Sequence, residues 1–193
     1  MKLLNRIAGL LPVLMLAALT AIAGYKPGDE IQPFTLKATN GKMVDMEKDY
    51  PKAKGFAKLY QQRLNDINTR YAPQGYAVLA ISSNDADAVP EDSFEEMKQR
   101  AHEQHYSYPY LYDETQTVAR AFGAYKTPHA FVVQRQGKSW VVRYSGAIDD
   151  NGAEPDKIKH PFVTEAVDAL LHGQDVATTS TKSVGCAIKW KTK

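Results

Sequence analysis

The sequence has 193 residues, of which 44% are hydrophobic, 24% charged and 10% aromatic. These are ordinary values for a globular protein, and the length suffices for one domain with a sizeable core and short extensions. The formal net charge of +2 and the lack of a long Lys/Arg run exclude a strongly basic nucleic-acid-binding protein.

Residues 1–23 have the features of a secretory signal peptide. Lys2 and Arg6 flank the start of an apolar stretch, and Ala21-Ile22-Ala23 places small residues where signal peptidase requires them. An uncleaved membrane anchor is the alternative, but the apolar stretch is slightly short for a span and contains Pro12. We therefore expect cleavage after Ala23, no stable membrane span in the mature chain, and a periplasmic or secreted protein.

Beyond the signal peptide, predicted strands and helices alternate. Asn40-Gly41 predicts a hairpin between short strands at 34–36 and 43–46, because Asn-Gly accommodates positive φ angles. Apolar residues at helical spacing predict a helix over 57–71, and the apolar run 76–81 predicts a strand buried on both faces. The remaining predicted elements are a helix, a strand, a helix, two hairpin strands and a final helix: residues 90–104, 108–112, 114–122, 129–133, 140–144 and 161–171.

This order of elements favours an α/β fold with a mixed, mainly parallel central sheet flanked by helices. The terminal strand pair and the closing helix indicate a thioredoxin-like arrangement of residues 24–173. Residues 174–193 are rich in Thr, Ser and Lys and lack a clear period, so we assign them to a C-terminal tail.

Four segments carry a resemblance to a known family. They are PEDSFEEMK (90–98), PYLYDETQTVARAFGAYKTPHAF (109–131), YSGAIDDN (144–151) and VGCAIKWK (184–191). The chain from 25 to 191 resembles the peroxiredoxin-like branch of the alkyl hydroperoxide reductase/thiol-specific antioxidant (AhpC/TSA, or redoxin) family. The resemblance implies a thioredoxin-like fold and thiol-disulfide or peroxide-reducing ancestry. It also implies a buried strand that leads into a C-x-x-C motif at the start of the first long helix, whose positive end activates a thiolate.

The sequence departs from the family pattern at this motif. Gly55-Phe56 runs straight into Ala57-Lys58, so about ten residues, a strand of ordinary length plus the motif, are missing. The missing strand belongs centrally, between 76–81 and 129–133. We expect either that another segment, such as Met43–Met46, takes its place, or that the domain is destabilised, because unpaired buried backbone groups are costly.

Thr127-Pro128 corresponds to the loop that in thioredoxin-like proteins carries a cis-proline beside the active thiols. We expect this bond to be cis, with the backbone of Thr127 available to an extended substrate; an ordinary trans proline at a strand start is the alternative. His129 follows, and it either faces this region or serves as a structural strand residue.

Cys186 is the only cysteine, so no internal disulfide is possible. A leftover cysteine in an exported protein is a free thiol or forms an intermolecular bond. Lys182 and Lys189 are near in sequence and favour a thiolate, although a packed or inert tail cysteine is the simpler interpretation. Alone, Cys186 can form a mixed disulfide but cannot complete a dithiol cycle.

We predict no metal site and no cofactor. His102 and His105 lack a third ligand nearby, and the acidic loops do not have an EF-hand pattern. These loops contain Asp85, Asp87, Glu91 and Asp92, and Asp149, Asp150 and Asn151.

The sequence leaves three functions open. The first is an exported redoxin-family protein without dithiol activity. The second is a non-catalytic module that binds an extended peptide or a protein partner at the Thr127-Pro128 surface. The third is a one-cysteine thiol protein that uses Cys186.

Overall fold

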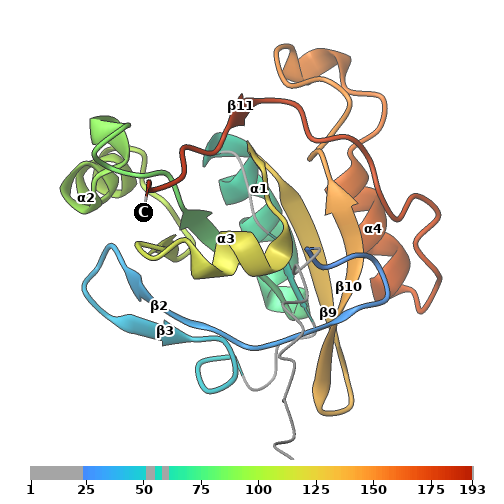
Figure 1. The fold of residues 1–193 in the computed structure, drawn as a ribbon. Helices are drawn as coiled ribbons and strands as arrows, with labels where there is room; N and C mark the ends of the chain where they lie inside the picture. Colours follow the sequence, from blue (N-terminus) through green and yellow to red (C-terminus); the bar gives the residue numbers. More distant parts are fainter. Residues whose placement is uncertain (1–23, 51–54, 58–60, 193) are drawn as a thin grey trace, which may run out of the picture.

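The structure is a computed structural model that describes residues 24–50, 55–57 and 61–192 (Figure 1). The predicted signal peptide lies outside these residues. Across the part of the chain that is described, no helix combines the length and the apolar character needed to cross a membrane.

The elements alternate along the chain much as predicted. The strands are β1 (Glu30–Ile31), β2 (Thr35–Ala38), β3 (Met43–Asp45), β4 (Gly55–Ala57), β5 (Tyr76–Val78), β6 (Ala80–Ser82), β7 (Tyr110–Tyr112), β8 (Lys126–Thr127), β9 (Ala130–Gln136), β10 (Ser139–Gly146) and β11 (Cys186–Ala187). The α-helices are α1 (Gln61–Tyr71), α2 (Phe94–Glu103), α3 (Thr117–Phe122) and α4 (Phe162–Leu171), and the short 3-10 helices are η1 (Ala72–Gln74), η2 (Pro90–Asp92) and η3 (Pro155–Lys157).

The strands form a mixed sheet, and the fold is α/β of the thioredoxin-like type. One group has the order β1-β10-β9-β4-β5 and another β3-β2-β7-β6, and Leu79 alone separates β5 from β6. Among the described strands, the parallel pairs are β4–β5 and β6–β7, at the centre. The sheet is less parallel than the sequence suggested, because β1 and the hairpins β2–β3 and β9–β10 add antiparallel strands on both sides.

Side chains of β9 alternate between two hydrophobic clusters, one on each face of the sheet. Ala130 and Val132 pack in the cluster that contains α1 and α4, whereas Phe131 and Val133 pack in the cluster that contains α3. This is the period of two expected for a strand covered on both faces. Figure 1 shows the same arrangement, with α3 on one side of the strands and α1 and α4 on the other.

The central position left open by the sequence is occupied by β4. Its three residues pair in parallel with β5 and antiparallel with β9, with Phe56 opposite both Ala77 and Val133. The alternative occupant, Met43–Met46, is wrong, because β3 pairs with β2 at the other edge of the sheet. The loss of a longer strand from this position stays a prediction.

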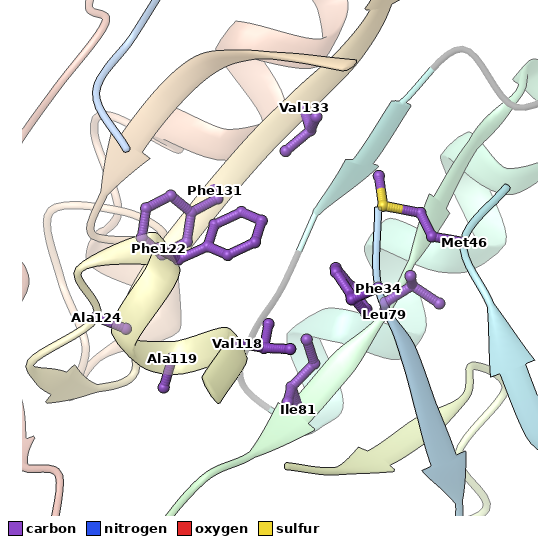
Figure 2. A pocket seen from close by; sticks show the side chains of 10 residues that line it. All are labelled: Phe34, Met46, Leu79, Ile81, Val118, Ala119, Phe122, Ala124, Phe131 and Val133. Atoms are coloured by element: carbon purple, nitrogen blue, oxygen red, sulfur yellow. The ribbon is translucent and has the colours of Figure 1, made fainter. Parts of the chain in front are cut away.

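A small apolar cavity lies beside this short strand. It has a volume of about 40 Å³, and its walls come from β9, from Leu79 and β6, and from α3 (Figure 2). Among the described strands, β6 pairs with β7 alone, so the space next to it is not filled by a further strand. Close packing is normal in protein cores, so the cavity is a local packing gap between the sheet and α3.

Candidate functional site

A cleft of about 970 Å³ opens at the C-terminal end of β6. Its lining includes Arg63 and Leu64 of α1, the tyrosines before and within β7, and the segment from Lys126 to His129. Ligands of α/β proteins bind preferentially at the carboxyl ends of strands. The position of the cleft therefore makes it the candidate site.

Thr127 and Pro128 form part of the cleft rim, and the peptide bond between them is cis, as expected. Thr127 is exposed and Pro128 is half-buried. Thr127 is the last residue of β8. Because β8 belongs to a sheet of two described strands, it is an edge strand, and it lies next to the cleft. An edge strand offers backbone N–H and C=O groups to an added extended segment.

This edge is occupied by the protein's own tail. β11 pairs antiparallel with β8, and Cys186 lies directly opposite Thr127, with Ala187 opposite Lys126. Cys186 is exposed, so the expectation that it packs in the domain is wrong, whereas the expectation of an inert thiol stays a prediction. The sequence did not predict that the tail and its thiol lie here; in the structure both lie beside Thr127-Pro128.

Gly185 allows the close approach of the tail to the cis-proline. A Cβ atom at this position would collide with the carbonyl oxygen of Thr127 and would lie 3.1 Å from Cδ of Pro128. Its φ of +152° is also one that side-chain-bearing residues rarely adopt. A glycine is therefore required immediately before Cys186 for the tail to pair with β8.

Beyond β11, the tail is held by the loop that precedes α3. Gln116 is 1% exposed, and its Nε2 donates to the carbonyls of Ser83 and Lys189, both at 2.8 Å. Its Oε1 accepts from the backbone N–H of Lys191 at 2.8 Å. Asp113 shapes this loop by accepting from the N–H of Ala119, in the first turn of α3, at 2.9 Å. Every side-chain bond of Gln116 thus connects the loop to the strand end or to the tail.

Three tyrosines line another wall of the cleft. The ring of Tyr106 stacks on Tyr108 with centroids 4.9 Å apart and meets Tyr110 edge-on at 5.5 Å. Burial is the main cause that raises the pKa of Tyr108 and of Tyr110, and the neighbouring phenols add to it for Tyr108. These groups stay protonated at neutral pH. We call residues 106, 108 and 110 the tyrosine wall; it contributes aromatic surface to the lining of the cleft.

His129 also lines the cleft, but its ring is part of the structural packing. It is 8% exposed, its Nε2 lies 3.0 Å from Oγ of Ser145, and its ring stacks on Phe131 at 4.4 Å. His129 therefore faces this region and is also packed as a structural residue.

The acidic loops have structural partners. Asp149 pairs with Arg63 at 2.6 Å, and Asp92 pairs with Arg100 at 3.2 Å. The backbone N–H of His160, followed by that of Lys159, lowers the pKa of Asp150. Among the described residues, no group of three or more His, Cys, Asp and Glu side chains is placed to hold a metal ion, and His102 and His105 belong to none.

Sequence reasoning did not find β11 or the role of Gln116. The pairing of Lys126-Thr127 with Cys186-Ala187 is long-range, and β11 has two residues, so no local periodicity reveals it. The available signal is the Gly-Cys-Ala-Ile order, in which a glycine precedes a short apolar run.

Comparisons with known proteins agree with this architecture. Residues 27–144 match the family model described as AhpC/TSA family. A crystal structure of an uncharacterized conserved protein from Geobacillus kaustophilus has a TM-score of 0.79 and 34% identity, covering 89% of this chain and 95% of that chain. A hypothetical protein from Sinorhizobium meliloti has a TM-score of 0.77 and 31% identity, covering 88% and 97%. A Neisseria meningitidis protein described as a thioredoxin shares the fold, with a TM-score of 0.54, 17% identity and coverage of 78% and 93%. No curated protein matches the chain significantly.

Proposed function

The chain belongs to the AhpC/TSA family, and from this premise we propose that it is an exported member that binds an extended partner in its cleft and carries out no dithiol oxidoreduction. Export is supported by the signal-like features of residues 1–23. The thiol-disulfide ancestry is inferred from the family relationship. The proposed loss of dithiol chemistry is inferred from the cysteine content of this chain.

One observation carries the proposed loss of dithiol chemistry: the only sulfhydryl of the chain is Cys186, in β11 rather than in α1. Reduction of a partner disulfide transfers two electrons and converts two thiols of the reductant into one disulfide. A single thiol that attacks a disulfide stops at the mixed disulfide, because no second thiol displaces the partner.

Binding of an extended partner is supported by the form of the cleft. The backbone of β8 at Thr127 already pairs with an extended segment, β11, and the tyrosine wall offers aromatic contact area. Main-chain pairing gives such a site affinity for extended segments, and side-chain pockets give it selectivity.

A disulfide-reduction assay tests the proposal. The reduced mature chain is mixed with a disulfide-bonded protein substrate in the absence of any other thiol, because dithiothreitol would itself release a mixed disulfide. We expect no release of fully reduced substrate, and Cys186→Ser should behave identically in this readout. Release of fully reduced substrate by the wild type contradicts the proposed loss of activity.

The second candidate, a one-cysteine thiol protein, is favoured by the exposure of Cys186 at the cleft rim beside Pro128. Here the thiolate would attack a disulfide of a thiol partner, forming one mixed disulfide and releasing one thiolate. Intact-mass measurement after incubation with glutathione disulfide would show a single adduct, and Cys186→Ser would show none. An unmodified wild type would exclude this candidate.

A further inference from the structure

The C-terminal segment 179–191 is attached at two places, with β11 between them. At the first place, the N–H of Ser145 donates to the carbonyl of Thr179 at 3.0 Å, and the N–H of Thr181 donates to Ser145 at 3.1 Å. Oγ1 of Thr181 is 2.6 Å from the hydroxyl of Tyr144. This first anchor joins the tail to the end of β10.

The second anchor follows β11. Ile188 is 7% exposed and packs in the hydrophobic cluster that contains α3. The N–H of Lys189 donates to Oδ1 of Asn84 at 2.9 Å, and its carbonyl accepts from Asp85 and from Gln116. This end of the tail is therefore built into the domain by buried polar and apolar contacts.

The stretch between the anchors is exposed and touches the candidate site. Val184 is 72% exposed, and Gly185, Cys186 and Ala187 are also exposed. The bonds of this stretch are the pairing of Cys186-Ala187 with β8 and the bond from Nζ of Lys126 to the carbonyl of Gly185 at 3.1 Å. Its side chains bury little, and its main interaction is with the backbone edge at Thr127.

We infer that β11 is an internal ligand of the partner-binding edge, which a partner must displace, and that the tail displays the kind of segment the edge accepts. This inference rests on the function proposed above. The accepted segment is extended and has a glycine against Thr127-Pro128 and a small or thiol-bearing residue opposite Thr127. Gly185 and Cys186 fill these two positions.

The physical basis is competition at high local concentration. A strand tethered on both sides has an effective concentration far above that of a free partner. The apparent affinity for the partner equals the affinity of the open form multiplied by the fraction of molecules in which the edge is open. We therefore expect opening of β11 to strengthen binding of a matching peptide by at least about tenfold.

The test uses two open forms of the protein. Gly185→Val places a side chain against Thr127 while leaving both anchors in sequence, and a chain that ends at Ser183 removes β11 altogether. Lys182→Val is the matched control, because it introduces the same side chain at an exposed position of the same tail. Circular dichroism and thermal melting establish that each variant folds, and Gly185→Val answers the question alone if the shortened chain does not fold.

Two fluorescein-labelled peptides serve as probes in fluorescence-anisotropy titrations. The first has the sequence of residues 184–193 with Ser in place of Cys, and the second has Gly-Ser-Ala-Ile in an unrelated flanking sequence. We expect the first to bind the shortened chain at least about 100-fold more tightly than the wild type, in line with tethered competition. We expect the second to bind both open forms at least tenfold more tightly than the wild type or Lys182→Val.

The outcomes separate this inference from the proposed function. Equal binding of the second peptide to wild type and open forms overturns the competition by β11 but leaves the binding function intact. Binding of the first peptide to the shortened chain alone, with no binding of the second to any form, supports β11 as the internal ligand and contradicts the proposed recognition of a partner. Failure of both peptides to bind any folded form overturns the inference.

Discussion

Two regions of the molecule differ in how completely they are built. The side formed by β8, β11 and the Gln116 loop is joined by hydrogen bonds to the tail, and its buried amide has its donor and acceptor atoms satisfied. The other region, the centre of the sheet, has the three-residue strand β4 and a small cavity between the sheet and α3, and the nearby helix α1 contains no cysteine. The two parts of the proposed function therefore depend on different segments: partner binding on β8 and the tail, and the loss of dithiol chemistry on the absence of cysteine from α1.

Removal of the Gln116 amide should lower the stability of the side that contains the tail. Gln116→Ala leaves the carbonyl of Ser83 and the N–H of Lys191 without this partner, and we expect a loss of about 3 kcal/mol in unfolding free energy, since buried unpaired groups cost about 1–3 kcal/mol each. Urea unfolding measures the change, and hydrogen exchange at residues 186–190 should show faster opening of the tail.

Gln99→Ala is the control for this substitution, because Gln99 is exposed on α2. Its unfolding free energy should stay within about 0.5 kcal/mol of the wild type. If Gln116→Ala is as stable as Gln99→Ala, the two regions do not differ as the structure indicates.

The first anchor of the tail should give the protein a dependence on alkaline pH. Burial raises the pKa of Tyr144 from 10.0 to about 12, and its hydroxyl contacts Thr181. Because the folded state holds this proton more tightly than the unfolded chain, the stabilisation is complete below pH 10 and is lost as pH rises from 10 to 12.

Over this window the wild type should lose about 2.7 kcal/mol more than Tyr144→Phe, from the two-unit shift at 1.36 kcal/mol each. Urea unfolding between pH 9 and 12 measures the slopes, and other buried tyrosines cancel in the comparison. Tyr125→Phe, at a side chain that is 47% exposed, should follow the wild type. Parallel slopes for wild type and Tyr144→Phe would contradict the assignment.

The small cavity between the sheet and α3 should accept an added methyl group. Val133 lines the cavity, and Val133→Ile should raise the unfolding free energy by about 0.8 kcal/mol, the value for one buried methylene. Val142 is fully buried but does not line this cavity, so Val142→Ile should lower stability by about 1 kcal/mol through overpacking. Thermal unfolding distinguishes the two, and a loss in both variants would mean that the cavity is not available.

Local patterns in the sequence predicted much of the fold but not the links between distant segments. The apolar run 76–81 and the helix stop at Gly75 correspond to β5, β6 and the end of η1, since these signals depend on neighbouring residues. The cis bond at Thr127-Pro128 was predicted from a resemblance that spans several consecutive motifs. The place of β4 was not predicted, because three residues without a period have no strand signal until β5 and β9 flank them.

The candidate site was predicted in part. Thr127 and Pro128 do line the cleft, whereas the tyrosine wall was not predicted as part of the site. The position of Cys186 depends on a chain reversal and on two anchors that no local rule encodes.

A lone, outward-pointing sulfhydryl in β11 has a practical consequence. A maleimide dye would attach to this protein at one position only, with no engineered cysteine and no competing site. Since that position lies opposite Thr127, the emission of the dye would report, in each molecule, whether β11 is paired with β8 or detached from it. The native chain is thus suited to single-molecule spectroscopy of the opening of β11.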